Sequence, residues 1–478
     1  MDDTILFVIL LAAPVGGAAI SLLPRDGIEV LASTISAIIT VVVALVFLIS
    51  GVSGVFGYFY ADGLTRIMAI TISSVFLTSV AYSAFYIKRI KEPFIRFRWY
   101  YSLVDMFVFT MLLAVTVNDL GFVWIAIEAT TVSSALLVAL ERERTSIEAA
   151  WRYTLIVSAG LVASLLSVIF VYYSQGTLVI SDLLTKPIES GLLMSVAVGF
   201  ALVGYGTKAG IAPMHAWLPD AHSEAPSPVS AMFSGILLPT SIYALVRTFN
   251  LLQGSAVFDP MRNLLIGFGI FTALLAAVIM GHQRNYKRML AYSSMENMGI
   301  ILVGFALGGI GAIGAVVQIV AHAFAKSSAF YEAGNVLVAF NSKSMEEVQG
   351  VAKKLKLSGY LFTLSCLSVT GAPPFGVFVG EFMILSQAMA SGNILLVILL
   401  AIAYMYAFIG LNRQSIRMIF GQRRRGPEWE GTMPGPESTV RRENLLSVAI
   451  PLTNLTISLI IGIYMIPLIL QAATGFGL

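Results

Sequence analysis

The segment KAGIAPMHAWLPDAHSEAPSP, from Lys208 to Pro228, continues an apolar run that begins at Gly191. An ammonium group surrounded by hydrocarbon costs several kcal/mol unless it is paired or hydrated. A lysine at this depth is therefore a functional-site hypothesis by default. It indicates a chain that moves ions.

The composition places the whole chain in a membrane. Its 478 residues are 58% hydrophobic and only 12% charged, and the mean hydropathy is +0.87, far from the values of ordinary soluble domains. The single cysteine, Cys366, excludes an internal disulfide and cannot by itself hold an iron–sulfur cluster. Any electron chemistry must therefore occur in a partner.

Apolar windows of about 20 residues predict an all-α integral membrane protein with about fourteen transmembrane helices. One of these windows, 310–340, is long enough to leave a miscount by one helix as the alternative. The windows are 3–22, 28–50, 64–87, 100–118, 120–140, 152–174, 190–212, 228–250, 260–281, 289–307, 310–340, 358–388, 392–418 and 446–470.

Basic residues gather in alternate connections, whereas the opposite connections hold almost none beyond Lys186. Cytoplasmic loops carry an excess of lysine and arginine. We therefore expect both termini on the non-cytoplasmic side of the plasma membrane. The basic residues on the cytoplasmic side are then Arg25, Lys88, Arg89, Lys91, Arg96, Arg98, Arg142, Arg144, Arg284, Lys287, Arg288, Lys343, Lys353, Lys354, Lys356, Arg423, Arg424, Arg425, Arg441 and Arg442.

Two windows are interrupted in comparable ways, one around Gly210 and Pro213 and the other at Gly371-Ala-Pro373-Pro374. Proline removes a backbone donor and clashes with the preceding turn, so each helix should be discontinuous there. Paired broken helices in two halves of a transporter point to an ion site near the bilayer midplane, within an inverted repeat. The alternative is that these prolines only kink the helices for packing.

We expect five parts in the chain, and the two repeats among them rest on helix count and break positions because the two halves share no convincing sequence identity. The connection before the last window has three consecutive arginines, Arg423 to Arg425. We expect it to contact either the soluble arm of a partner or anionic lipid headgroups. The alternative is a solvated linker without a partner. The parts are an N-terminal three-helix segment (1–98), a first inverted repeat of five helices (99–252), a second inverted repeat (253–420), a cytoplasmic polar loop (421–445) and a C-terminal helix (446–478).

Acidic and basic residues alternate inside the apolar windows. His322 and Lys326 are four residues apart and so share one helix face. A contact between Glu128 and Lys208, if the fold makes one, would act as a switch, because closing it favours the charged lysine and opening it lets the lysine release a proton. The residues of this series are Glu128, Lys208, Glu296, His322, Lys326, Glu332 and Glu381.

Four stretches together resemble a known family over roughly residues 60 to 420. They are Lys208 to Pro228, RNYKRMLAYSS from Arg284 to Ser294, HAFAK from His322 to Lys326, and GEFMIL from Gly380 to Leu385. They are similar to the antiporter-like, proton-translocating subunits shared by respiratory complex I, Mrp cation/proton antiporters and energy-converting membrane-bound hydrogenases.

The resemblance implies a proton path and a set of partners. It places Glu128, Lys208, Lys326 and Glu381 in the path, and His222, Glu296, His322 and Glu332 are supporting candidates. It implies no cofactor or metal in this chain, and iron–sulfur clusters with, as one option, a nickel–iron centre in partner subunits. The partners implied are other membrane and peripheral subunits of a redox complex, further antiporter-like subunits, lipid, protons and sodium, without nucleic acid.

Details of three motifs look most like the hydrogenase-type branch: IEATT from Ile127, SMENM from Ser294, and Ser234-Gly235. Complex I subunits more often carry a histidine near Ser234, so water or His222 would have to bridge the two halves here. We expect a subunit that translocates protons, or protons against sodium, in a membrane-bound redox complex. The alternatives are an Mrp-type antiporter subunit without a redox partner, and a complex I NADH:quinone oxidoreductase subunit.

Purely structural roles for the same residues remain as alternatives. Glu128 could pair with a lysine and never titrate. Asp105 and Glu296 could each accept hydrogen bonds from hydroxyl or backbone donors within the bundle. The solvated rim of a loop is an alternative for His215, Asp220, His222 and Glu224.

Overall fold

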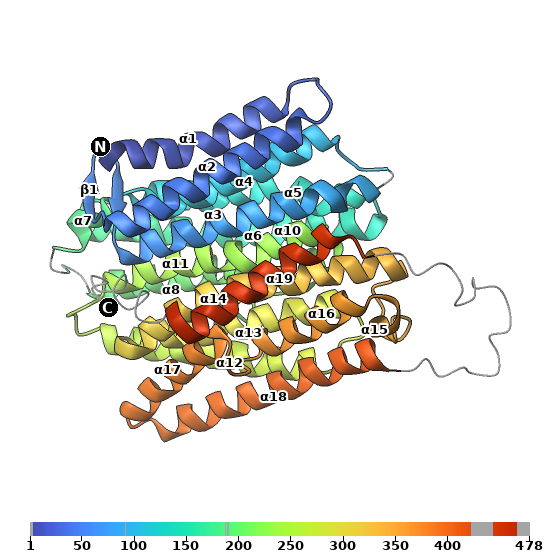
Figure 1. Cartoon of the computed structure of the whole chain (residues 1–478). Coiled ribbons are helices and arrows are strands. Elements are labelled where there is room, and N and C mark those ends of the chain that lie inside the picture. Colours follow the sequence, from blue (N-terminus) through green and yellow to red (C-terminus); the bar gives the residue numbers. More distant parts are fainter. Residues whose placement is uncertain (1–2, 91, 187, 189–190, 422–442, 466–478) are drawn as a thin grey trace.

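The chain folds as one bundle of long helices that run side by side (Figure 1). The computed structural model describes residues 3–90, 92–186, 188, 191–421 and 443–465. Thirteen helices in this part of the chain are long and apolar enough to cross a membrane. The molecule is therefore an all-α, multi-pass membrane protein.

The N-terminal part packs along one edge of the bundle (Figure 1). A small antiparallel hairpin on this part pairs Gly54 with Ala61 and Phe56 with Phe59. The elements are α1 (Asp3–Ser21), α2 (Ile28–Ser50), β1 (Gly54–Phe56), β2 (Phe59–Ala61), α3 (Gly63–Tyr86) and η1 (Ile87–Arg89).

The middle of the chain supplies the central helices. Its elements are α4 (Phe97–Thr116), α5 (Leu120–Val138), η2 (Ala139–Glu141), α6 (Arg144–Gln175), α7 (Ile180–Leu183), α8 (Gly191–Ala209), α9 (Leu218–Glu224), α10 (Ser227–Met232), the π-helical turn η3 (Phe233–Leu237) and α11 (Leu238–Asn250).

The last part reaches the edge opposite α1 with α18, and α19 then returns to pack on α14 (Figure 1). Its elements are α12 (Phe258–Met280), α13 (Tyr286–Leu307), α14 (Gly309–Phe340), α15 (Val351–Lys354), α16 (Lys356–Val369), α17 (Gly376–Ala390), α18 (Ile394–Phe420), α19 (Leu445–Ile460) and η4 (Ile461–Met465).

The window 358–388 is the one that does not form a long helix. It contains α16, of 14 residues, and α17, of 15 residues. The chain between them holds Pro373 and Pro374, which cannot donate backbone hydrogen bonds, and Gly371 with a positive φ of 66°. The thirteen long spans therefore match the other thirteen of the predicted windows.

The second interruption separates α8 from α9. Gly210 has a positive φ of 78°, which a side chain would make costly. Side-chain and backbone donors close the gap: Trp217 Nε1 donates to the Thr207 carbonyl at 2.8 Å, and Ala212 N donates to Thr272 Oγ1 at 3.0 Å. The broken segment is thus held in place by α12 and by its own indole ring.

Small residues let α6 and α8 approach closely. A Cβ atom added at Gly160 would lie 2.6 Å from Thr207 Cβ. Only glycine therefore fits at this crossing, as is typical of helix interfaces in membranes. The contact fixes the rotation of α8 one residue before Lys208.

A buried ion pair joins the start of α3 to the end of α11. Arg247 Nη2 donates to Asp62 Oδ1 at 2.7 Å, and its guanidinium lies over the Tyr243 ring at 4.7 Å from the centroid. Burial opposes ionisation of Asp62, but Arg247 and hydrogen bonds from Thr65 outweigh it and hold the pKa of this carboxyl below its usual range.

Asp62→Asn should destabilise the fold, because it leaves the Arg247 charge buried without its partner. Breaking a buried pair in this way costs about 3–5 kcal/mol. Thermal unfolding of the detergent-solubilised protein measures the loss. The matched control is Asp259→Asn, which removes an exposed pair with Arg262 and should have little effect. Equal stability of the two variants would show that the buried pair contributes nothing.

Candidate functional site

Lys208 lies in the last turn of α8 and is fully buried. Its ammonium group donates to the Ile127 carbonyl at 3.1 Å and to the Thr131 hydroxyl, both on α5. The ring of Tyr153 lies beneath it, with the centroid 5.8 Å away. Lys208 thus donates hydrogen bonds to neutral oxygen atoms and lies over an aromatic ring.

Glu128 lies on the same turn of α5 but does not form an ion pair with Lys208. Its Oε1 atom accepts a hydrogen bond from Ser158 Oγ at 2.7 Å, and Oε2 has no partner. The contact that would close the proposed switch is therefore open in this structure. The Glu128 charge nevertheless acts on the lysine across the gap.

Two neighbouring aromatic rings, those of Tyr153 and Trp217, lie between Lys208 and His222. The ring centroids of Tyr153 and Trp217 are 4.8 Å apart, and those of Trp217 and His222 are 6.2 Å apart. His222 lies on α9 and is fully buried, with Nδ1 at 2.9 Å from the Leu218 carbonyl and Nε2 without a partner. The imidazole is therefore part of the interior and not of a solvated rim.

The middle of the bundle is crossed at the π-helical turn η3. Ser234 Oγ lies 2.7 Å from Ser294 Oγ on α13, so a hydroxyl pair occupies the place where the sequence has no histidine. Nearby, both ring nitrogens of His322 are buried without partners. His322 and His222 are close enough for their charges to interact.

Lys326 repeats the arrangement of Lys208 in the second half of the chain. It is fully buried on α14, and its ammonium group donates to the Leu290 carbonyl at 2.6 Å and to the Ser293 hydroxyl on α13. Both lysines thus bind a carbonyl and a hydroxyl from the neighbouring helix. Neither meets a carboxylate.

Asn297 connects the lysine region to Glu296. Its amide nitrogen donates to Glu296 Oε2 at 2.8 Å and to the Ser293 carbonyl at 2.9 Å, and its oxygen accepts from Gln318 Nε2 at 2.9 Å. The other oxygen of Glu296 has no partner. A continuous polar chain therefore runs from Lys326 through Ser293 and Asn297 to Glu296.

Glu381 lies on α17, directly against the second helix break. A side chain at Gly371 would collide with the Glu381 carboxyl. The Glu296 and Glu381 charges act on one another, and the Tyr404 hydroxyl donates to the Glu381 carbonyl at 3.4 Å. The acid of this half thus faces the unwound backbone.

Glu332 is separate from the polar chain that connects Lys326 to Glu296. It lies six residues after Lys326 on α14, which places it on another face of the helix. Asn335 Nδ2 donates to its Oε2 atom at 3.0 Å and also reaches the Ser447 carbonyl, and Oε1 has no partner. Among the described residues, no hydrogen bond or ion pair joins Glu332 to Lys326.

The ionisable residues of the candidate site share one property: none of them forms an ion pair among the described residues. They are Glu128, Lys208, Glu296, His322, Lys326, Glu332 and Glu381. An unpaired charge inside a membrane protein is costly, and such groups usually mark ion pathways. The lysines and acids instead contact neutral hydrogen-bond partners.

Ion pairs instead gather where α9 meets the loop after α14. Lys343 Nζ lies 3.0 Å from Glu224 Oε2, and Asp220 binds both Arg152 and Arg288. Burial raises the pKa of Glu224, but Lys343 and the Thr145 hydroxyl outweigh it and leave the pKa below its usual range. These ion pairs connect α9 to α6, to α13 and to the loop after α14.

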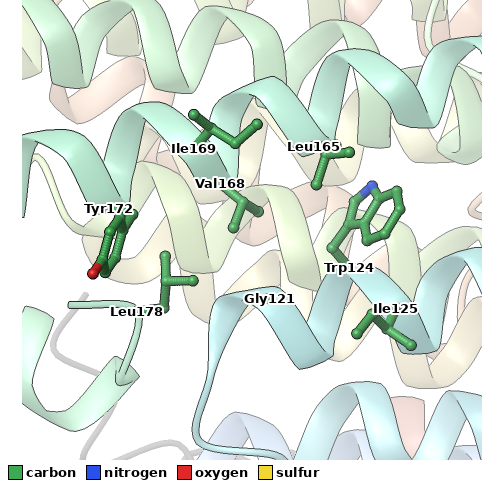
Figure 2. A pocket seen from close by; sticks show the side chains of 8 residues that line it. All are labelled: Gly121, Trp124, Ile125, Leu165, Val168, Ile169, Tyr172 and Leu178. Carbon is green, nitrogen blue, oxygen red and sulfur yellow. The ribbon is translucent and has the colours of Figure 1, made fainter. Parts of the chain in front are cut away.

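An apolar pocket of about 350 Å³ lies between α5 and α6 (Figure 2). Trp124, Leu165 and Tyr172 line it, and the Tyr172 side chain is 57% exposed. The pocket opens on the outside of the bundle and contains no carboxylate, lysine or histidine. It therefore suits a hydrocarbon chain better than an ion.

The described part of the chain holds no group of three His, Cys, Asp or Glu side chains placed to bind a metal ion. Several functional candidates were not predicted from the sequence: Ser293, Asn297, Gln318 and the buried Lys287, which donates to the Ala225 carbonyl. Lys287 looked like a loop residue because Arg284 and Arg288 flank it. Ser293, Asn297 and Gln318 are polar but uncharged, and nothing else in the sequence marks them as functional candidates.

Fold and site together define a multi-pass membrane protein with an ionisable interior. A model of the family described as NADH:quinone oxidoreductase/Mrp antiporter, transmembrane, matches residues 117–413. The chain belongs to this family.

Curated relatives come from more than one kind of complex. The hydrogenase-4 component F homologue of Methylacidiphilum infernorum (isolate V4) is 31% identical over 77% of this chain and 80% of its own length. The NADH-quinone oxidoreductase subunit N of Desulforudis audaxviator is 29% identical over 72% and 70%. Hydrogenase-4 component B of Escherichia coli is 28% identical over 67% of this chain, which spans about half (49%) of that longer protein.

Solved structures share the fold over nearly the whole chain. A chain of the membrane-bound sulfane sulfur reductase, an archaeal respiratory membrane complex, superposes with a TM-score of 0.87 at 21% identity, covering 98% of this chain and 96% of that one. A chain of the Mrp complex from Dietzia sp. DQ12-45-1b gives 0.84 at 20% identity, covering 98% and 97%. A chain of Thermus thermophilus respiratory complex I gives 0.76 at 23% identity, covering 97% and 98%.

Glu224→Gln should lower stability by about 1 kcal/mol or less at neutral pH, because it removes the pair with Lys343. The folded state lowers the pKa of Glu224, so the stabilisation is present above the unfolded value of about 4.3 and is lost as the pH falls through the folded value. Thermal unfolding of wild type and variant from neutral to acidic pH measures this.

The difference between the two proteins should shrink as the pH approaches 4. Glu346→Gln serves as the control, because its pair with Arg284 is exposed and long, at 3.8 Å. A Glu224 difference that stays constant with pH would contradict the assignment.

Proposed function

We propose that this chain is an ion-translocating subunit that moves protons, or protons in exchange for sodium, across the membrane. One observation carries the proposal: Lys208, Lys326 and Glu296 are buried in a membrane-spanning bundle, and all lack an ion-pair partner. A purely structural role would favour paired charges or apolar residues at these positions.

The proposed path begins at Glu128 and Lys208. The open oxygen of Glu128 can approach the ammonium group, and closing that contact favours the charged lysine. When the contact opens, as here, Lys208 keeps only the Ile127 carbonyl and the Thr131 hydroxyl. The weaker support favours loss of the proton toward the interior.

His222 is the proposed acceptor between the halves. Its free Nε2 atom lies within a group of aromatic rings that reaches back to Lys208 and contacts Phe330 of α14, with ring centroids 6.0 Å apart. The interacting pair His222 and His322 then bridges toward Lys326. The Ser234–Ser294 hydroxyl pair offers a second crossing.

Beyond Lys326, the proposed path continues to Glu296 and Glu381. A proton leaves the ammonium group at Ser293 and reaches the free Glu296 oxygen, while Asn297 holds the carboxyl in place. Glu381 then exchanges it with one side of the membrane through the break at Gly371. Glu332 remains a supporting candidate on a side branch.

We further propose that residues 99–252 and 253–420 are inverted repeats of five helices, with 1–98 as a three-helix addition. Matching elements support this. Helices α6 and α14 are both 32 residues long, α5 and α13 both begin after a side-chain cap, and α8/α9 correspond to α16/α17 as the broken helices. Counting α16/α17 as one span gives the fourteenth helix.

The complex that we propose for this subunit is a membrane-bound redox complex of the hydrogenase type. Two of the relatives named above are hydrogenase-4 components, which supports that branch over an Mrp-type antiporter or complex I. Partner subunits would then carry iron–sulfur clusters and, in a hydrogenase, a nickel–iron centre. Nickel, iron and sulfide analysis of the affinity-purified complex separates these alternatives.

The proposed location is the plasma membrane, with both termini on the non-cytoplasmic side, as the basic connections indicate. The polar loop 421–445 is proposed to contact a partner's soluble arm or anionic lipid; residues 422–442 of it lie outside the described residues, as do residues 466–478 of the C-terminal part 446–478.

Lys208→Met should abolish ion translocation in vesicles that carry the assembled complex, because the variant cannot accept a proton at the start of the path. Electron transfer is followed in parallel, and subunit content shows assembly. Lys186→Met, an exposed lysine on a connection, is the control and should translocate normally. Unchanged transport in assembled Lys208→Met would remove this lysine from the path.

A further inference from the structure

A second polar site lies between α1, α2 and α4. Asp105 of α4 is fully buried, and neither of its carboxylate oxygens has a hydrogen-bond partner. No described lysine, arginine or histidine forms an ion pair with it. A buried carboxylate without a counter-charge requires a bound cation or a proton to neutralise it.

Two hydroxyl groups face this carboxyl. Ser33 and Ser36 of α2 lie beside it; Ser33 Oγ has no hydrogen-bond partner, and Ser36 Oγ donates to the Ala13 carbonyl at 3.0 Å. Gly17 of α1 makes the approach possible, since a Cβ atom there would lie 2.6 Å from Asp105 Oδ1 and 2.8 Å from Ser36 Oγ. Three unpartnered oxygen atoms and one further hydroxyl therefore converge.

The site points away from the proposed proton path. Phe107, two residues after Asp105, packs on Phe233 of η3 with ring centroids 5.6 Å apart. Two residues of a helix are separated by about 200°, so Asp105 faces the opposite side of α4. There, residues 4–21 of α1 contain no charged side chain, and α2 contains only Glu29. Neither this part of α1 nor α2 thus supplies a counter-cation.

We propose that Asp105, Ser33 and Ser36 bind one sodium ion between α1, α2 and α4. Hard cations take oxygen ligands, and both carboxylate oxygens and the two hydroxyls supply them. The single negative charge matches a monovalent ion, whereas a divalent ion would leave an unpaired positive charge in an apolar bundle. None of these residues belongs to the proposed path, so the site stands independently of the proposed function.

The proposed site is tested by measuring whether sodium slows the reaction of the Asp105 carboxyl with a carbodiimide. Dicyclohexylcarbodiimide reacts with protonated carboxyls in apolar surroundings, and mass spectrometry of the full-length protein locates the product. In sodium-free choline buffer Asp105 should react. Sodium chloride at about ten times its dissociation constant should slow the reaction about tenfold by mass action, and potassium chloride or choline chloride should not.

Serine variants separate direct binding from an indirect effect. Ser33→Ala and Ser36→Ala should keep the reaction at Asp105 but lose sodium protection. Ser21→Ala, a buried serine of α1 that donates to the Glu29 carbonyl, should keep both. No reaction at Asp105, a reaction that sodium does not slow, or equal protection of Glu296 in the same sample would each overturn the proposal.

Discussion

The structure depends on keeping lysine and glutamate side chains inside a hydrocarbon-bounded bundle without pairing them. A charge at this depth is expensive, and a salt bridge would be the simplest remedy. Lys208 and Lys326 instead rest on carbonyl and hydroxyl oxygens of a neighbouring helix. Such contacts tolerate both the charged and the neutral form of lysine, which a tight carboxylate pair would not.

The broken helices follow from the same requirement. Backbone that leaves the helix inside a membrane must be enclosed by protein or must line a cavity. Here the first break is bridged by Trp217 and Thr272, and the second lies against Glu381 and is fastened through Asn412, which donates to Thr370 Oγ1 at 2.8 Å. Each break thus places free backbone and small residues beside an ionisable side chain.

The class of protein, the spans and both break positions could be predicted from the sequence because they depend on local quantities: window hydropathy, proline and glycine. Three other features depend on which helix faces meet. They are the missing ion pair between Glu128 and Lys208, the burial of His222, and the hydrogen bond between Asn297 and Gln318. A single sequence does not contain that information. Asp105 shows the same limit, since its partners Ser33 and Ser36 are about 70 residues away along the chain.

If the unpaired buried groups bind and release protons during turnover, as we propose, the carboxyl of Glu296 should change its protonation state. Infrared difference spectroscopy of the assembled complex, before and during turnover, detects the carbonyl band of a protonated carboxylic acid. We expect a band that shifts in deuterium oxide and is absent in Glu296→Gln, while assembly is preserved. A difference spectrum that Glu296→Gln leaves unchanged would contradict the proposal.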